Sequence, residues 1–260
     1  MAHWRVGTSG WTYRAWAGIF YPETLKSSDL LAYYSHRFNT VEVNTTFYRF
    51  PPAPLVKGWI RKSPDDFVFS VKSSRFFTHL KRLNVADPDF QKRFGDFLER
   101  LSVLEKKLGP ILFQLPPHFT KNLSVLENFL AFLPSDHSFV VEFRHVGWFD
   151  DEVYALLKKY HVALAVVSAP GIPYVPMVTS SLAYFRLHGA DSWYNYRYSY
   201  DELKDVAQKA LQLGDLPGVK DVFLYFDNDV SGYAIENAKS LTEIFRALRP
   251  EAAKPPDKKE

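Results

Sequence analysis

The chain has 260 residues, of which 47% are hydrophobic, a formal net charge of +3 and no cysteine. This length fits one large α/β domain with a sizeable core. The lack of cysteine excludes disulfides, thiolate catalysis and cysteine-ligated metal sites, and the small net charge does not by itself indicate a nucleic-acid-binding protein.

Short apolar segments alternate with helical stretches along most of the chain. The segments expected to be strands are 3–8, 39–44, 67–72, 110–115, 138–144, 162–167, 182–188 and 221–227. The stretches expected to be helices are 28–36, 54–62, 88–108, 123–133, 150–160, 200–213 and 232–248. This alternation predicts a parallel sheet whose strands are connected by helices.

Helix 88–108 has the clearest pattern. Asp87 suits its N-cap, Pro88 suits its first turn, and Gly109 stands where a C-terminal glycine is common. Its expected apolar face consists of Phe90, Phe94, Phe97, Leu101, Leu104 and Leu108. The caps expected for the later helices are Asn122, Asp150, Ser199 with Glu202 in a capping box, and Ser231.

Eight such repeats within about 250 residues favour a (β/α)₈ TIM barrel over residues 1–250. The sixth unit is expected to be irregular, because the proline- and glycine-containing run 168–174 cannot form a regular helix. A doubly wound open sheet is the alternative fold, but its usual G-x-G-x-x-G loop is missing from the first turn, Gly7-Thr8-Ser9-Gly10-Trp11.

Localisation and the tail follow from simpler patterns. No apolar run reaches the roughly 18 residues of a membrane span, and the N-terminus lacks a signal-peptide pattern, so we expect a cytoplasmic protein without membrane contact. The segment 251–260 is rich in charge and contains two prolines, which predicts a disordered tail.

Polar residues gather where the predicted strands end. In a strand, residues two apart point to the same side, so Glu42-x-Asn44, Glu142-x-Arg144 and Arg186-x-His188 each present a polar pair on one face. In TIM barrels the chemistry lies at this C-terminal end of the strands. We therefore expect one charged pocket at the mouth. The candidate catalytic residues are Glu42, Glu142, His188 and Asp227; the candidate ligand-binding residues are Trp11, Asn44, Tyr48, Lys72, Gln114, Arg144, His145, Arg186, Trp193 and Asn228.

Acid–base chemistry on an anionic ligand is the first interpretation of this pocket. Glu42 or Glu142 would act as acid or base with His188 as proton-transfer partner. Lys72, Arg144 and Arg186 would bind a phosphate or carboxylate, and a hydrolase acting on phosphate esters is the enzyme class that fits this mixture.

Three other interpretations stay open. A divalent metal on Glu42, Glu142, His188 and Asp227 is not favoured, since no H-x-H or H-E-x-x-H spacing is present and the nearby cations would repel it. Alternatively, the charged residues form a structural ion-pair network that plugs the barrel. Finally, the basic and aromatic segments 72–82 and 193–198 can bind nucleic acid or carbohydrate without catalysis, unless their rings pack onto the barrel rim.

Several of these segments together resemble one family. They are 7–11 (GTSGW), 39–49 (NTVEVNTTFYR), 109–117 (GPILFQLPP), 141–149 (VEFRHVGWF), 184–189 (YFRLHG) and 226–228 with Asn237-Ala238. This order of motifs resembles the YecE-like family, also called domain of unknown function 72. The resemblance implies a TIM barrel and no established activity. One position departs from the family pattern. The motif of the eighth strand commonly reads Phe-Asn-Asn, and here Asp227 replaces the first asparagine, which adds a carboxylate.

Overall fold

The computed structural model describes residues 2–49 and 51–250. Eight parallel strands form a sheet in the order β1-β8-β7-β6-β5-β4-β3-β2. The strands are β1 His3–Thr8, β2 Thr40–Val43, β3 Val68–Lys72, β4 Leu108–Gln114, β5 Phe139–Glu142, β6 Ala163–Ser168, β7 Leu182–Leu187 and β8 Asp221–Phe226. The sheet curls into a nearly closed barrel, which confirms the expected TIM-barrel fold and rules out the open sheet.

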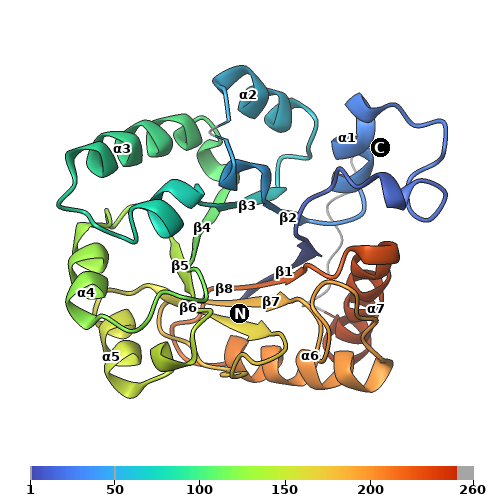
Figure 1. Ribbon diagram of the computed structural model, residues 1–260. Helices are drawn as coiled ribbons and strands as arrows, with labels where there is room; N and C mark the ends of the chain where they lie inside the picture. The colour runs from blue at the N-terminus through green and yellow to red at the C-terminus, as the bar shows by residue number, and fades with distance from the viewer. Residues whose placement is uncertain (1, 50, 251–260) are drawn as a thin grey trace.

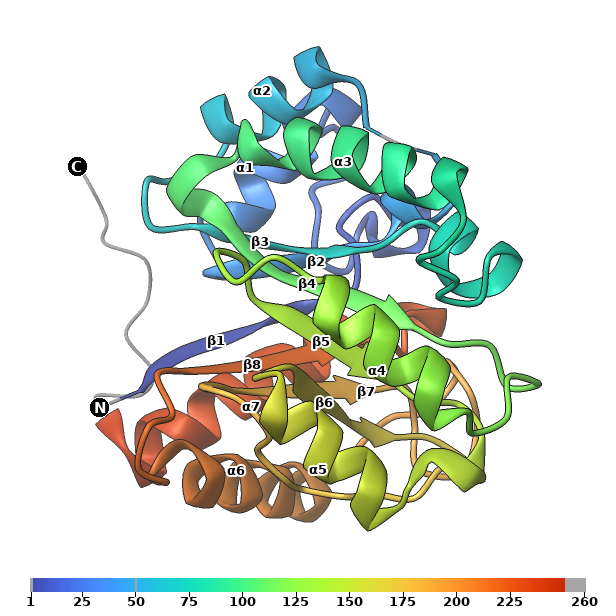
Figure 2. The same cartoon turned by 90° about the vertical axis from the view of Figure 1, so that its left-hand side faces the viewer.

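Helices lie outside the strands (Figure 1). They are α1 Leu30–Ser35, α2 Ala53–Arg61, α3 Pro88–Ser102, α4 Leu123–Phe132, α5 Asp151–Lys159, α6 Tyr200–Gly214 and α7 Tyr233–Leu248. Figure 2 shows α1, α2 and α3 on one side of the barrel and α5, α6 and α7 on the opposite side. Between β6 and β7 no helix forms, so the irregular sixth unit is confirmed.

The helix caps follow the sequence closely. Asp87, Asn122, Asp150 and Ser199 each accept a hydrogen bond from a backbone amide in the first turn of the helix that follows. Ser199 and Glu202 complete the expected capping box. These side chains satisfy amide groups that have no partner inside the helix, and so they fix where each helix begins.

Two local predictions were wrong. Helix α3 ends at Ser102 rather than continuing to 108, and Gly109 lies inside β4. A Cβ at Gly109 would lie 2.6 Å from Cγ1 of Val68, so this glycine serves close strand packing instead of ending a helix. The last helix is capped by Gly232, whose φ is 77°, and not by Ser231.

The barrel closes where β1 meets β2. Ser9 and Glu42 form a parallel bridge, and the amide of Gly10 donates to the carbonyl of Glu42 at 2.8 Å. A Cβ at Gly7 would lie 2.3 Å from the carbonyl oxygen of Thr40. Only glycine permits this approach of the two backbones, which brings the ends of the first and second strands together.

The barrel interior changes from apolar to charged along its axis. Its buried apolar layer includes Leu112, Val140, Tyr184 and Tyr225 from four different strands. Two residues further along each of these strands stand Gln114, Glu142, Arg186 and Asp227. Because residues two apart in a strand share a face, these polar side chains turn into the same interior at the C-terminal end.

No helix in the described part of the chain is long and apolar enough to cross a bilayer. The expected disordered tail at 251–260 lies outside the described residues.

Candidate functional site

Arg186 is the centre of the charged cluster at the C-terminal end of the barrel. Its side chain is fully buried. Nε donates to Glu42, Nη1 donates to Oε2 of Glu142 at 2.6 Å, and Nη2 donates to Oε1 of Glu42 at 2.7 Å and to Oδ2 of Asp227 at 2.9 Å. Nη1 also lies 3.2 Å from Nε2 of His188. A guanidinium has five N–H donors, and these contacts use all of them, so Arg186 keeps none for a ligand in this arrangement.

Glu42 is held as completely as Arg186. Besides the guanidinium, the hydroxyl of Ser9 donates to its Oε1 at 2.6 Å and the hydroxyl of Tyr184 donates to its Oε2 at 2.7 Å. The carboxylate is fully buried. With this many donors around its two oxygens, every direction from which a substrate proton would arrive is occupied. The geometry therefore suits Glu42 to fixing Arg186 rather than to exchanging protons.

Glu142 is shared between two arginines. Its Oε1 accepts from Nε of Arg144 and its Oε2 accepts from Arg186. Burial raises the pKa of Glu142, but the charges of Arg144 and Arg186 outweigh burial and hold that pKa well below its usual range. Glu142 is thus ionised at neutral pH and is a poor proton donor.

The contacts of His188 determine which ring nitrogen carries the proton. Its Nε2 lies 3.0 Å from Nη2 of Arg144 and 3.2 Å from Nη1 of Arg186. Since guanidinium nitrogens only donate, Nε2 must accept, and the neutral ring then carries its proton on Nδ1. Nδ1 lies 3.1 Å from Oδ2 of Asp227. His188 is fully buried and is covered by the ring of Trp193, whose centroid is 5.4 Å from that of the imidazole.

Asp227 connects the buried cluster to the rim. It contacts Arg186 and His188, and 13% of its side chain is exposed. Although burial raises its pKa, Arg186 and then His188 lower it further, so the net shift of the Asp227 pKa is downward. Asparagine, which is common here in the YecE-like pattern that the sequence resembles, has an amide oxygen without the charge that Asp227 offers its two partners.

Lys72 differs from the other cations of the cluster. Its ammonium lies 4.3 Å from the ring centroid of Phe47, and within the described residues no carboxylate or hydrogen-bond acceptor reaches it. Burial and the neighbouring charge of Arg186 lower the pKa of Lys72 to about 8. Arg144 is also incompletely paired: Nε and Nη2 have partners, but for its Nη1 none is found in the described part of the chain.

Asp229 and Tyr13 also belong to the cluster, although neither was among the site residues predicted from the sequence. Burial and the nearby charge of Asp227 raise the pKa of Asp229 to about 8, and its Oδ1 is buried without a hydrogen-bond partner among the described residues. Burial and Asp229 together raise the pKa of Tyr13. The sequence signal for Asp229 was its place in the strand-eight motif, but its burial could not be deduced from the motif.

The remaining predicted residues divide into two groups. Gln114 lies in the interior layer, and its Nε2 donates to the carbonyl of Leu115 at 2.6 Å. Asn44 stands one residue after β2 with a buried Oδ1 that lacks a partner among the described residues. Trp193 lies under Arg144, with its ring centroid 4.5 Å from the guanidinium carbon. These three remain at the site.

Four others have different surroundings. His145 accepts from the amide of Gly147 and caps a short turn, and Asn228 donates to Tyr196 and Asn237, which fixes the loop after β7. Trp11 is buried against Trp59 in the outer core. Tyr48 is 76% exposed. The contact that the structure gives Trp11 is therefore one of core packing.

The aromatic rings of the two rim segments mostly pack inward. Phe77 is fully buried, Phe76 is partly buried against the core, and Tyr198 is buried. Tyr194 is 43% exposed, with its ring 5.6 Å from that of His188. Within the described residues, the segments 72–82 and 193–198 therefore offer a ligand single exposed rings such as that of Tyr194.

No grouping of three or more His, Asp and Glu residues suited to a metal ion occurs within residues 2–49 and 51–250. The carboxylates named for a metal converge, but Arg186 lies between them. Its guanidinium contacts Glu42, Glu142 and Asp227 at once, and so it takes the place that a cation would need.

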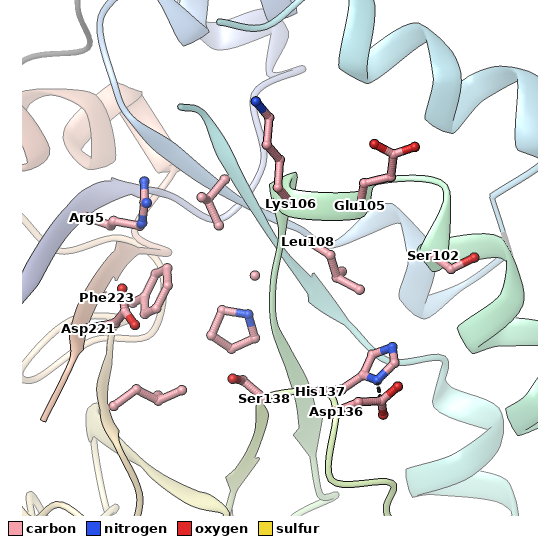
Figure 3. A pocket seen from close by; sticks show the side chains of 14 residues that line it. Arg5, Ser102, Glu105, Lys106, Leu108, Asp136, His137, Ser138, Asp221 and Phe223 are labelled. Carbon is pink, nitrogen blue, oxygen red and sulfur yellow. Dashed lines mark hydrogen bonds and ion pairs between the residues drawn. The ribbon is translucent and has the colours of Figure 1, made fainter. Parts of the chain in front are cut away.

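A separate cavity lies at the other end of the barrel (Figure 3). Its volume is about 370 Å³, and its lining includes Arg5, Lys106, His137, Asp221 and Phe223. Most of these residues stand at or before the first residues of their strands, and the apolar layer of the interior separates them from Arg186. His137 contacts Asp136 and Asp221 contacts His3, so two of its carboxylates have partners. In TIM barrels this N-terminal end serves stability, and the candidate site is therefore the cluster around Arg186.

Fold and site together define a TIM-barrel protein with a buried ion-pair network at the C-terminal end of its strands. A family model described as "Protein of unknown function DUF72" matches residues 5–260. The chain belongs to this family, which confirms the YecE-like resemblance. It is 28% identical to the UPF0759 protein YunF of Bacillus subtilis, with 92% of this chain and 93% of YunF aligned. It is also 31% identical to the UPF0759 protein YecE of Escherichia coli, over 55% of this chain and 49% of YecE.

Solved structures of the family have the same fold. A DUF72 family protein from Thermotoga maritima is 32% identical, with a TM-score of 0.83 over 94% of this chain and 99% of that one. A DUF72 family protein from Enterococcus faecalis has a TM-score of 0.81 at 22% identity, over 93% and 95% of the two chains. These names carry no activity or ligand.

Proposed function

We propose that this protein is an enzyme that binds a small anionic molecule, most naturally a phosphorylated one, at the C-terminal mouth and carries out acid–base chemistry on it. The observation that carries the proposal is the contrast between paired and unpaired cations. Arg186 uses all its donors inside the protein, whereas Lys72 and Nη1 of Arg144 have no acceptor among the described residues. Lys72 and Arg144 are partly buried, and an anionic ligand at the mouth would supply the acceptors that these two cations lack within the protein.

The roles in this proposal differ from those first expected. Glu42 and Glu142 hold the arginines, and Arg144 with Lys72 binds the anion. Lys72 and Asp229 are the proton-transfer groups, because each has a pKa of about 8 and so exchanges protons near neutral pH. His188 and Asp227 orient Arg144 and Arg186 through contacts of 3.0 and 2.9 Å.

Titration calorimetry with inorganic phosphate tests the anion site. We expect binding that weakens at least roughly tenfold in Lys72→Met and in Arg144→Met, since each change removes one charge-assisted contact. Lys121→Met is the matched control. Lys121 lies in the loop after β4, at the same end of the barrel, but it already pairs with Asp150 and Glu152. Equal binding by all four proteins, or no binding by the wild type, would contradict the proposal. A screen of phosphate esters and other phosphorylated metabolites for turnover follows.

Binding of nucleic acid without catalysis is the second candidate, because Tyr48 and Tyr194 expose rings beside this rim. A single-stranded oligonucleotide separates the two functions. Its affinity should fall steeply with salt and depend on the two tyrosines if the rim binds nucleic acid. Under the proposed function, Tyr48→Ala and Tyr194→Ala leave phosphate binding unchanged.

A further inference from the structure

Two lysines lie at opposite ends of the barrel strands: Lys107 is buried and has hydrogen-bond acceptors, whereas Lys72 is partly buried and has none among the described residues. Lys107 lies before the first residue of β4, and its ammonium donates to the carbonyls of Ile60 and Ser63 and to the hydroxyl of Ser63 at 2.9–3.1 Å. Lys72 ends β3 at the opposite end of the barrel and has only the ring of Phe47 beside its ammonium within the described residues. The two side chains thus provide an internal comparison between a structural lysine and an unpaired one.

The interior direction of Lys72 follows from its strand. Val68 belongs to the buried layer inside the barrel and Ser70 hydrogen-bonds to the interior hydroxyl of Tyr225 at 2.8 Å. Lys72 continues this series two residues further on, so it points into the same interior. Its backbone is also fixed, because the hydroxyl of Thr46 donates to the carbonyl of Lys72 at 2.5 Å. The amine is therefore held at the inner side of the mouth.

The protonation of Lys72 gives its amine unusual reactivity. With a pKa of about 8, roughly a tenth of the Lys72 side chains are neutral at pH 7, about 200 times more than for an ordinary lysine. Only the neutral amine has the lone pair that attacks carbon. Desolvation next to another cation is a known way to activate a lysine, and here Arg186 is that cation.

We propose that Lys72 is a nucleophile that forms an imine with the carbonyl carbon of an anionic aldehyde or ketone held at the mouth by Arg144. This inference rests on the proposed function and names the substrate class of that site. In the reaction, the Nζ lone pair forms a bond to the carbonyl carbon and the carbonyl oxygen takes up a proton. The carbinolamine then loses water as the C=N double bond forms. Lysine and carbonyl compound give imine and water, so the step needs no oxidant or reductant.

Reductive trapping with glyoxylate tests this inference on the full-length protein. Glyoxylate carries a carboxylate beside its aldehyde, and cyanoborohydride reduces the imine to a stable carboxymethyl-lysine that peptide mass spectrometry locates. We expect Lys72 to be modified at least roughly tenfold faster than Lys107, whose ammonium is held by three acceptors, or the surface residue Lys121, whose pKa is raised by its contact with Asp150. Propionaldehyde, which is uncharged, should modify Lys72 more slowly than glyoxylate does, and Arg144→Met should abolish that preference.

The outcomes separate the inference from the function on which it rests. If Lys72 reacts no faster than Lys121 although phosphate binds at the mouth, the imine is overturned and the anion site stands. If Lys72 reacts rapidly but equally with glyoxylate and propionaldehyde, the amine is nucleophilic and selection of anions is overturned. Thermal unfolding of each variant shows whether it is folded, and the wild-type comparison between Lys72 and Lys107 needs no variant.

Discussion

Replacing Arg186 by methionine tests whether the ion-pair network is as tightly coupled as its geometry indicates. The change removes the partner of three carboxylates, those of Glu42, Glu142 and Asp227. Breaking a buried ion pair from one side typically costs about 3–5 kcal/mol, because the opposite charge stays buried. In a domain of this size about 1 kcal/mol shifts the melting temperature by roughly 2–4 °C, so a decrease of roughly 6–20 °C is expected.

The loss should depend on pH in a defined direction. In the wild type, burial raises the pKa values of Glu142 and Asp227, but the arginines outweigh burial and the net shifts are downward. Their stabilising contribution is present above the unfolded pKa of about 4 and is lost as the pH falls through the folded values. In Arg186→Met the same carboxyls stay buried with less positive charge, and their pKa values rise. The variant therefore loses stability as the pH increases above about 4, and the gap to wild type widens towards about pH 7.

Thermal unfolding followed by circular dichroism between about pH 4 and pH 8 measures this gap. Arg197→Met is the matched control, because Arg197 forms an exposed pair with Glu236 and its loss should cost less than about 1 kcal/mol. Adding Glu42→Gln and Glu142→Gln to Arg186→Met should restore part of the stability, since the unpaired charges are then gone. A gap below about 3 °C at neutral pH, or one that is equal at every pH, would refute the reasoning.

Two further predictions concern the loops beside the cluster. Asp229→Asn should be stabilising at high pH. Burial and the charge of Asp227 raise the pKa of Asp229 in the folded state to about 8, whereas its unfolded value is near 4. The wild type therefore loses stability as the pH rises from about 4 to about 8. The melting-temperature difference from wild type should grow up to about pH 8 and then level off; a constant difference would show that Asp229 is not buried as a neutral acid. Asn237→Leu should cost about 1–3 kcal/mol per group left unsatisfied, since its amide holds the backbone of Tyr198 and the side chain of Asn228. Limited proteolysis should then cut within 189–199 sooner than in wild type, and unchanged cleavage would mean that other contacts fix this loop.

Periodicity explains why so much of the barrel could be predicted. A strand turns every second residue inward, so the pairs Glu42-x-Asn44, Glu142-x-Arg144 and Arg186-x-His188 indicated their common face without any coordinates. Caps such as Asp87 and Ser199 act on amides two or three residues away, and they were therefore visible in the sequence. The residue at which α3 ends could not be predicted from such local patterns. Leu104 and Leu108 continue its apolar spacing, but Leu108 instead begins β4.

The roles within the cluster depend on contacts that no local pattern contains. Arg186 and Glu42 are 144 positions apart in the sequence, yet they share three hydrogen bonds. Arg186 and Lys72 both appeared in the sequence as cations at strand ends, and both were expected to bind an anion. The structure distinguishes them, because one guanidinium is saturated by carboxylates and the other cation is left with an aromatic ring.

The charge balance of the cluster assigns different tasks to its two incompletely paired cations. Glu42, Glu142 and Asp227 contribute three negative charges, and Arg144 and Arg186 contribute two positive ones, so a protonated Lys72 makes the group neutral. Inorganic phosphate bound to both cations would raise the pKa of Lys72 and remove its reactive form. Arginine stays charged at any physiological pH and is suited to holding the anion continuously. A ligand that places its anionic group on Arg144 and its carbonyl carbon at Lys72 uses both properties, and free phosphate should slow the trapping of Lys72 by occupying both cations at once.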